Sequence, residues 1–294
     1  MGAAAPAGLP VSGADAASAR DGGADEQDAL LALAAHAARI AGELLLERAA
    51  RGAQRDVSSK STPTDLVSEA DIAAERAIRE VLLARRPHDG FLGEEGSSDA
   101  GSSGLRWIVD PLDGTVNFLF GIPQWCVSVA VSDDAGTLAG AVYDPNREEL
   151  FSASRHGPAT LRSGSGELLA LTPPAQPAHL GREDLASTML ATGLAYDARV
   201  RAAQARVLAR VIPRVRDVRR FGSAALDLCW TALGRFDAYF ERTVKPWDIA
   251  AGALVCERAG LRVADLPVHD DLPWGILAAP PHLADALLEL VGGP

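Results

Sequence analysis

The stretch WIVDPLDGTVNF, residues 107–118, runs an apolar segment straight into two aspartates. Its first half, 107–109, is typical of a buried strand, and Pro111 biases Asp110 toward an extended conformation. Asp110 and Asp113 are like charges that repel each other at this spacing. A strand that only had to turn would not need both, so the pattern indicates that a positive partner is missing from the chain itself.

Gly114 and Thr115, which follow the aspartates, favour an anion site. Glycine lets the backbone approach a ligand closely, and a helix that opened here would present free N–H groups to a phosphate. Carboxylates beside an anion are tolerated when a hard cation lies between them, and Mg²⁺ takes such oxygen ligands. Taken alone, the stretch leaves two interpretations open: a magnesium–phosphate site, or a solvated aspartate turn.

Composition narrows the classes of function. The chain has 294 residues, a formal net charge of −11 and a pI of about 5.0, with 48% hydrophobic and 23% charged residues. That length suits one large domain or two ordinary ones. The acidic balance disfavours nucleic acid, whose binding requires Lys and Arg on phosphates. An anionic substrate would meet the same repulsion unless a cation intervened.

The cysteines Cys126, Cys229 and Cys256 are few, odd in number and far apart. They predict buried structural thiols, because a disulfide framework or a thiolate zinc site needs closer spacing. The histidines show no i, i+4 pair that would suggest a histidine metal site. No apolar stretch is expected to reach the length of a membrane span, and the N-terminus lacks the pattern of a secretory signal. These features predict a soluble cytoplasmic protein.

The order of elements predicts mixed helices and strands in layers. Residues 1–26 resemble a disordered tail, and the proline-rich segment 173–177 suggests a boundary between an N-terminal α+β part, 27–175, and a C-terminal α/β part, 176–294. Helices are expected at 29–51, 68–86, 198–212, 223–233, 248–258 and 281–291. Strands are expected at 90–96, 105–110, 125–132, 136–144, 149–154, 159–164, 187–193, 218–222, 237–242, 261–266 and 274–280, the middle ones forming an antiparallel meander. The fold class is therefore α+β, a layered sandwich of sheets and helices.

Further carboxylates stand where strands end or helices begin, which is where sites of α/β proteins gather. Glu94 and Glu95 follow a strand, and Glu241 ends another. Asp248 is placed to cap a helix, a role that would explain it without any ligand. Ser68 and Asp71 resemble a capping box that opens the helix over 68–86.

Several motifs together resemble the inositol monophosphatase family, over roughly residues 28–292. They are KSTPTDLVSEAD (60–71), GEE (93–95), WIVDPLDGTVNF (107–118), GSAALDLCWTALGRFDAYFE (222–241) and KPWDIAAGALVCERAG (245–260). The resemblance implies lithium-sensitive, Mg²⁺-dependent phosphatases of sugar phosphates. It also implies an αβαβα layered sandwich, of the inositol monophosphatase and fructose-1,6-bisphosphatase type, that is usually a homodimer.

The resemblance assigns metal ligands position by position. The first Mg²⁺ would be held by Glu94, Asp110 and the backbone carbonyl of Leu112. The second would be held by Asp110, Asp113 and Asp248. A third, weaker ion near Glu94 would bring the total to two or three.

Substrate and water contacts follow from the same resemblance. Glu94, Thr115 and Asp65 would be the catalytic residues, with the last two orienting the attacking water. Asp113 and the N–H groups of Gly114 and Thr115 would bind phosphate, and substrate hydroxyls would meet Glu241 and the backbone of Ala224. Lys60 lies in what is a mobile loop in the family.

The implied reaction is hydrolysis of a small phosphate monoester by direct attack of a metal-activated water. The implied substrate is myo-inositol monophosphate, with histidinol phosphate, fructose 1,6-bisphosphate and adenosine 3′,5′-bisphosphate as alternatives. The segment 260–275 departs from the family pattern, which bears on substrate preference.

Two rival interpretations are weighed against this one. A haloacid-dehalogenase-like phosphatase uses D-x-D-G-T, in which both aspartates share one strand face. Residues i and i+3 of a regular strand do not share a face, so DPLDGT disfavours this mechanism. A catalytically silent member serving as a binding or scaffold protein would be suspected if a ligand were lost, and none is.

Overall fold

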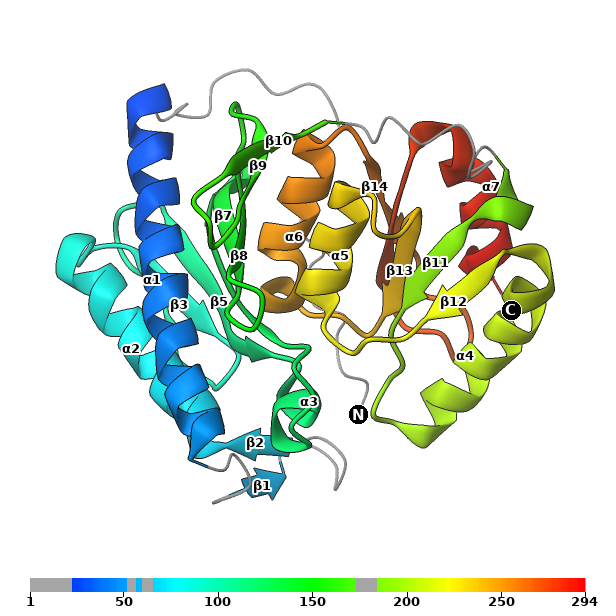
Figure 1. The fold of residues 1–294 in the computed structure, drawn as a ribbon, viewed down its shortest axis with the longest axis horizontal. Helices are drawn as coiled ribbons and strands as arrows, with labels where there is room; N and C mark the ends of the chain where they lie inside the picture. The colour runs from blue at the N-terminus through cyan, green and yellow to red at the C-terminus, as the bar shows by residue number, and fades with distance from the viewer. Residues whose placement is uncertain (1–22, 52–56, 60–65, 173–183, 294) are drawn as a thin grey trace.

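The computed structural model describes residues 23–51, 57–59, 66–172 and 184–293. Helices and sheets alternate in layers across the molecule, as Figure 1 shows. Helices α1 and α2 cover one face of a large sheet, α5 and α6 lie between this sheet and a smaller one, and α4 and α7 cover the far side. The predicted α+β layered sandwich is confirmed.

The large sheet has eight strands in the order β10-β9-β8-β7-β6-β5-β3-β4. All neighbours are antiparallel except β3 and β5. The strands are β3 (Gly90–Gly93), β4 (Ser98–Asp99), β5 (Arg106–Asp113), β6 (Cys126–Asp133), β7 (Gly136–Asp144), β8 (Glu149–Ser154), β9 (Ala159–Arg162) and β10 (Leu168–Leu171). The run from β6 to β9 is the predicted meander, and β10 extends it by one strand that was not predicted. A separate hairpin pairs β1 (Val57–Ser59) with β2 (Leu66–Ser68).

The first helical layer consists of α1 (Ala24–Ala50) and α2 (Glu69–Arg85). Residues 24–26, expected in the tail, instead form the first turn of α1. The expectation that no apolar stretch reaches the length of a membrane span does not hold for α1 by length and composition alone: an 18-residue window within Asp25–Ala50 has a mean hydropathy of 1.6. Alanine supplies much of that apolarity. One face of α1, including Ala34, Ala41 and Leu45, packs on the large sheet and is fully buried, as in the core helix of a globular protein.

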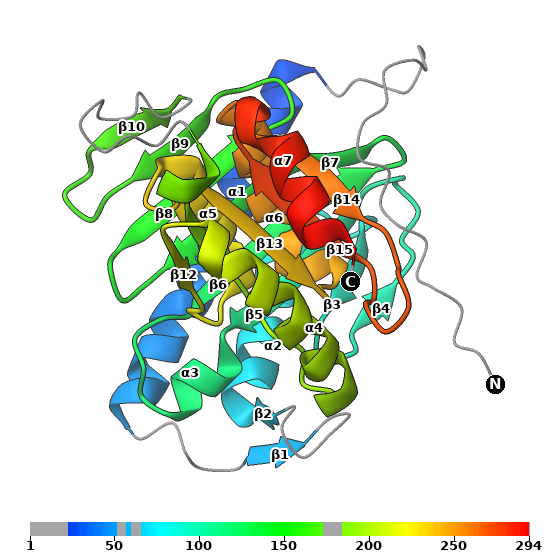
Figure 2. The same ribbon diagram turned by 90° about the vertical axis from the view of Figure 1, so that its right-hand side faces the viewer.

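The second half of the chain builds the other layers (Figure 2). The smaller sheet has five strands in the order β12-β11-β13-β15-β14. They are β11 (Met189–Thr192), β12 (Asp217–Arg219), β13 (Ala238–Arg242), β14 (Arg262–Leu266) and β15 (Gly275–Ala279). The helices of this half are α4 (Ala198–Val211), α5 (Ala224–Leu233), α6 (Pro246–Arg258) and α7 (Pro281–Gly292), with short 3₁₀ turns η2 (Leu185–Ser187) and η3 (Ile212–Arg214). The short helix α3 (Thr115–Leu119) belongs to the first half and follows β5.

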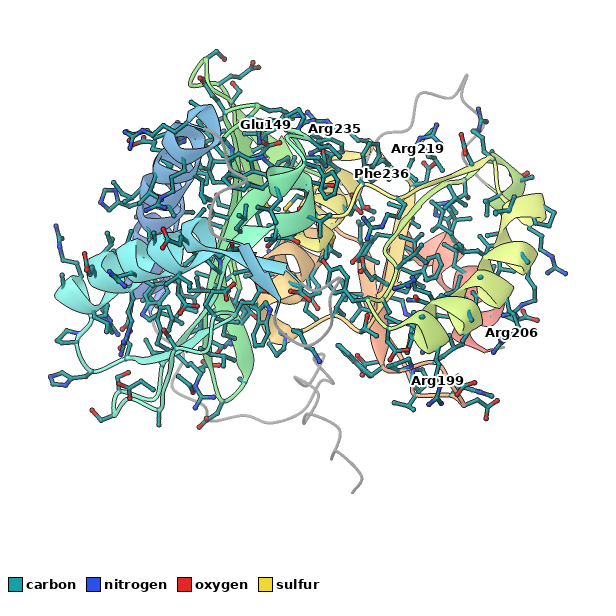
Figure 3. The ribbon with its side chains drawn as sticks, turned by 90° about the horizontal axis from the view of Figure 1, so that it is seen from below. Glu149, Arg199, Arg206, Arg219, Arg235 and Phe236 are labelled. Atoms are coloured by element: carbon teal, nitrogen blue, oxygen red, sulfur yellow. The ribbon has the colours of Figure 1, made fainter. Side chains whose placement is uncertain are left out.

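The middle layer joins the two sheets. One apolar cluster combines Ile108 and Phe151 of the large sheet with Leu228 of α5 and Ile276 of the smaller sheet. Arg235, just beyond α5, binds both carboxylate oxygens of Glu149 at the start of β8, and Figure 3 shows the two side chains together. The three cysteines are buried free thiols, as predicted. The division of the chain into two parts near residue 175 stays a prediction. The apolar cluster of the middle layer contains residues from both sides of this boundary.

Candidate active site

A β-bulge brings Asp110 and Asp113 to one face of β5. Asp110 pairs with Ser128 of β6 and Asp113 pairs with Cys126, so three residue steps on β5 match two on β6. Ser128 and Cys126 share a face, and their partners therefore do too. The expectation that residues i and i+3 point apart holds for a regular strand and is wrong here. The spacing of DPLDGT therefore no longer argues against the dehalogenase-like mechanism.

Four predicted ligands lie within electrostatic reach of one another. Burial raises the pKa of Asp110 well above its usual range, and the charges of Glu94, Asp113 and Asp248 raise it further. Burial likewise raises the pKa of Asp248 well above its usual range, and the charges of Glu94 and Asp113 raise it further. The backbone N–H of Glu94 donates to Val109 at 3.1 Å, which places Glu94 beside the end of β5. The structure therefore gathers these carboxyls around the β5 bulge.

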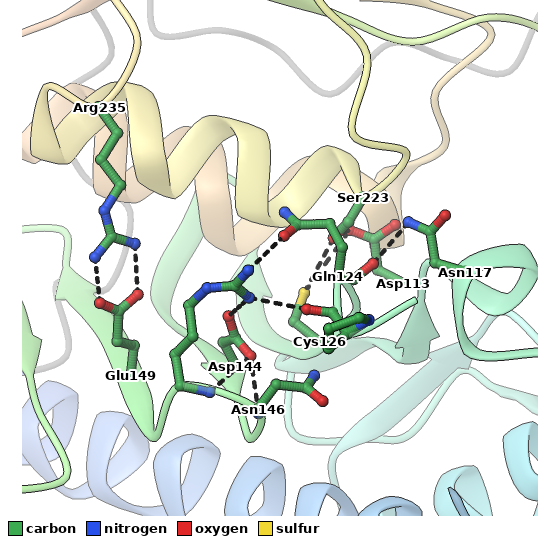
Figure 4. Close-up of polar contacts among 11 residues, drawn as sticks. Asp113, Asn117, Gln124, Cys126, Asp144, Asn146, Glu149, Ser223 and Arg235 are labelled. Atoms are coloured by element: carbon green, nitrogen blue, oxygen red, sulfur yellow. Dashed lines mark hydrogen bonds and ion pairs between the residues drawn. The ribbon is translucent and has the colours of Figure 1, made fainter. Parts of the chain in front are cut away.

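The start of α5 orients Asp113. Its Oδ2 accepts hydrogen bonds from the Ser223 hydroxyl and the Ala225 N–H, both at 2.7 Å, and the Cys126 thiol lies 3.8 Å away (Figure 4). Burial raises the pKa of Asp113 to about 6, although these hydrogen bonds act in the opposite direction. One oxygen is thus committed to protein donors.

Asp248 is not the cap that the sequence predicted. Helix α6 begins at Pro246, so Asp248 is its third residue. The Asp248 carboxylate accepts the Lys245 backbone N–H at 2.7 Å. Residue 248 therefore satisfies a free donor of the helix start and faces the carboxylate cluster at the same time.

The turn after β5 requires glycine at 114. Gly114 has φ 105°, a left-handed conformation, and a Cβ there would lie 2.9 Å from the Gln124 carbonyl oxygen. It precedes α3, which begins at Thr115 and supplies the helix start that the anion site would need. The Thr115 hydroxyl lies 2.9 Å from Asp71 Oδ1 and 3.1 Å from the Leu112 carbonyl oxygen, either of which can accept its proton.

Helix α2 supplies two acids that sequence reasoning missed. Asp71, predicted only as part of a helix cap, is fully buried and touches Thr115. Glu75, one turn further on, accepts the Glu95 backbone N–H at 2.9 Å and so supports the GEE segment. Both acids interrupt an apolar face of the helix, and that pattern was the available signal. Asp65 and Lys60, expected near the water and the substrate, lie outside the described residues.

Glu241 lies on β13 of the smaller sheet, within electrostatic reach of Asp113 and Asp248. The Tyr239 hydroxyl donates to it at 2.9 Å, and a side chain at Gly193 would collide with it. Burial raises the pKa of Glu241 to about 7, against the lowering effects of Tyr239 and Arg220. Nearby on α5, Asp227 is 1% exposed and has no hydrogen-bond partner for either oxygen among the described residues. Ala224, predicted to meet the substrate, is the first residue of α5.

The donor set fits a hard cation. Within the described residues, no group of three or more His, Cys, Asp or Glu side chains already has the spacing that would hold a metal ion. Burial and neighbouring charges raise the pKa values of Asp110, Asp113 and Asp248, and Glu94 and Asp110 share a hydrogen bond. Clustered carboxyls with no thiolate among them are the ligand type that Mg²⁺ takes. A cation would offset the repulsion among these groups.

Stability should depend on pH in a direction set by these acids. Asp113 and Glu241, with pKa values of about 6 and about 7, keep protons that an unfolded chain loses near pH 4. The folded state then binds more protons between about pH 4 and 7, so its stability falls as pH rises through that window. We expect the melting temperature in EDTA to fall from pH 5 to pH 8. A flat or rising profile in EDTA would contradict this.

Thr115→Val should slow turnover about 10- to 100-fold with little change in KM, because it removes the hydroxyl held by Asp71 while keeping the shape. Steady-state kinetics at saturating Mg²⁺ measure this. Thr188→Val is the control: Thr188 is equally buried, and its hydroxyl only caps a turn at Asp184. Equal losses in both variants would refute a role for Thr115 in the site.

A carboxylate cluster at a strand end, backed by a helix start and set in this layered sandwich, suits a phosphate-monoester hydrolase. Residues 26–291 match the inositol monophosphatase family, and the chain belongs to that family. It is an enzyme, a phosphoric monoester hydrolase, in a family that is generally metal-dependent.

Relatives and solved structures agree with this assignment. The chain is 44% identical over 239 residues to the inositol-1-monophosphatase SuhB of Mycobacterium tuberculosis, covering 79% of this chain and 80% of the relative. It is 40% identical over 241 residues to the Nus factor SuhB of Xylella fastidiosa, covering 80% and 83%. The SuhB structure from Bartonella henselae matches with a TM-score of 0.79 at 34% identity, covering 90% of this chain and 98% of that one.

Proposed function

We propose that this enzyme hydrolyses myo-inositol monophosphate by direct attack of water. The observation that carries the proposal is the pairing of the carboxylate cluster around Asp110 with a separate, half-buried acid, Glu241, on β13. The first suits a metal-bound phosphate and the second suits hydroxyl groups of a polyol. Relatives that carry the name inositol-1-monophosphatase support the same substrate.

The chain's own groups have distinct roles in this reaction. Two to three Mg²⁺ ions, held by Glu94, Asp110, the Leu112 carbonyl, Asp113 and Asp248, would polarise the phosphate and lower the pKa of water. The N–H groups of Gly114 and Thr115, with Asp113 beside them, position the phosphate. The Thr115 hydroxyl orients the attacking water in line with phosphorus, and Asp71 fixes that hydroxyl. The predicted role of Asp65 in orienting the water stays a prediction beside that of Asp71.

The polyol part of the substrate is proposed to contact β13 and the start of α5. Glu241 accepts substrate hydroxyls, the Ala224 backbone meets them from the start of α5, and Tyr239 holds the Glu241 carboxyl in place. A buried acceptor that loses its hydroxyl partner discriminates strongly between substrates.

A substrate panel tests the proposal. Initial rates are measured on myo-inositol 1-phosphate, histidinol phosphate, fructose 1,6-bisphosphate, adenosine 3′,5′-bisphosphate and p-nitrophenyl phosphate. The inositol ester should have the highest kcat/KM. A higher value for one of the other natural esters would transfer the proposal to that substrate.

Glu241→Ala should lower kcat/KM for the inositol ester about 10- to 100-fold more than for p-nitrophenyl phosphate, which lacks the hydroxyls. The metal concentration giving half-maximal activity should change little, since Glu241 is not among the proposed ligands. Glu289→Ala, on the outer helix α7, serves as the control. Equal losses on both esters would count against Glu241 as a specificity residue.

A homodimer and a cytoplasmic location are proposed on the family resemblance, with a small phosphorylated polyol as the partner molecule and neither nucleic acid nor membrane required. Light scattering at micromolar concentration tests the dimer.

A further inference from the structure

Asn117, in the short helix α3, joins two segments that border the site and lie far apart in the chain. Its Nδ2 donates to the carbonyl oxygen of Gln124 at 2.7 Å (Figure 4). The same Nδ2 donates to the carbonyl oxygen of Phe221, also at 2.7 Å. Phe221 stands 104 residues further along the chain. Asn117 is only 7% exposed, so water competes little for either bond.

The bond to Phe221 controls the entry to α5. Phe221 is followed by Gly222, whose φ is 86°, and by Ser223. Ser223 and Ala225 are the residues whose hydroxyl and N–H hold Asp113. Anchoring the Phe221 carbonyl therefore anchors the donors that orient Asp113.

The bond to Gln124 holds the turn at Gly114 and Thr115, which is proposed to bind phosphate and is called the phosphate turn below. The Gln124 carbonyl packs against Gly114, at 2.9 Å from where a Cβ would stand. Arg147 holds the Gln124 side chain at 3.0 Å, is itself bound to the buried Asp144 at 2.7 Å, and lies over the Trp230 ring of α5 at 4.8 Å. The Gln124 segment is thus held from both sides against Gly114.

We propose that Asn117 is a positioning residue that clamps the Gly114 turn to the entry of α5, and so sets the spacing between the phosphate turn and Asp113. Asparagine suits this place because one short amide carries two N–H donors. An aspartate of the same size would oppose two carbonyl oxygens, and an alanine would leave both carbonyls unpaired. The inference rests on the proposed function for its effect on turnover.

The test compares Asn117→Asp and Asn117→Ala with Asn146→Ala. Asn146 is the chain's other asparagine, and its Nδ2 has no hydrogen-bond partner among the described residues. Both Asn117 variants should lose about 10- to 100-fold in kcat, with Asn117→Asp at least as impaired as Asn117→Ala. Asn146→Ala should stay within about twofold, because no bond is removed. If Asn117 only fills space, Asn117→Asp will keep the wild-type kcat, which overturns the proposal.

Binding without turnover gives an independent readout. Thermal shifts are titrated with Mg²⁺ and with inorganic phosphate, and the half-saturating Mg²⁺ concentration should rise about tenfold or more in the Asn117 variants. A lower melting temperature with unchanged half-saturation would mean a purely structural role and would overturn the clamp. Asn117→Ser, which keeps one donor, should fall between wild type and alanine and serves if the other variants do not fold. If the wild type hydrolyses none of the esters, the proposed function fails, whereas these titrations still decide the clamp.

Discussion

Asp110→Asn should reduce turnover by on the order of 10³-fold or more at any Mg²⁺ concentration. Asp110 is 1% exposed, and its pKa is raised by burial and by three surrounding acids, which marks it as the centre of the cluster. Asp110 is the proposed ligand shared by two ions, so the loss of its charge would weaken both Mg²⁺ sites. An asparagine would also turn N–H groups toward carboxylates that need a cation. Measuring kcat across a Mg²⁺ titration tests this directly.

The control must be an aspartate outside any ion pair. Asp133, the last residue of β6, is bound to Arg155 at 2.7 Å and is therefore not a neutral site. Asp134, the next residue, is exposed between β6 and β7, and Asp134→Asn should keep the wild-type rate. If the kcat of Asp110→Asn stays within tenfold of the wild-type value, Asp110 is not a metal ligand of the site.

Stereochemistry separates a ligand from a nucleophile at Asp110. Direct attack by water inverts the configuration at phosphorus, while an aspartyl-phosphate intermediate involves two inversions and gives net retention. We expect inversion with a chiral, isotopically labelled thiophosphate ester. Retention, or an acyl phosphate isolated on Asp110, would support the dehalogenase-like mechanism, whose rejection can no longer rest on the spacing of DPLDGT because the bulge aligns both aspartates.

Local features of the fold were predictable because a few neighbouring residues determine them. Asp-Asp-Ala-Gly at 133–136 and the Asp-Pro-Asn turn at 144–146 mark hairpin connections, and strands β6, β7 and β8 follow in the predicted order. Helix α2 ends at Arg85, two residues before Pro87, as a proline stop requires. In each case the residues that predict the feature lie within a few positions of the turn or helix end that they determine.

The rest of the site depends on contacts between distant segments. The Asp71 carboxyl meets Thr115 across 44 residues, so a local pattern could only suggest the helix start. The bulge between Asp110 and Asp113 depends on how β5 pairs with β6. Buried Arg242, whose guanidinium binds the carbonyl oxygens of Pro267, Pro273 and Gly292, secures the unusual 260–275 segment, and the strand sequence around Arg242 gave no sign of it.

Removal of divalent metal should abolish turnover and also lower the melting temperature at pH 7.5 to 8. The physical reason is the same for both effects. Burial and mutual repulsion raise the pKa values of Asp110, Asp113 and Asp248, so deprotonating them without a cation is unfavourable. Added Mg²⁺ should restore activity and should raise the melting temperature more at pH 8 than at pH 5, where the acids still hold protons.

Calcium should separate these two effects. It takes six to eight oxygen ligands at about 2.3–2.6 Å in loose geometry, whereas Mg²⁺ requires a near-octahedral set at about 2.0–2.1 Å. Calcium can therefore neutralise the carboxylates around Asp110 and recover the melting temperature, but it should not align water and phosphate with Thr115. We expect Ca²⁺ to stabilise the EDTA-treated enzyme, to leave it inactive, and to inhibit competitively with Mg²⁺. Undiminished turnover in EDTA would exclude a metal-dependent reaction, and full activity with Ca²⁺ would show that the geometry around Thr115 does not limit the rate.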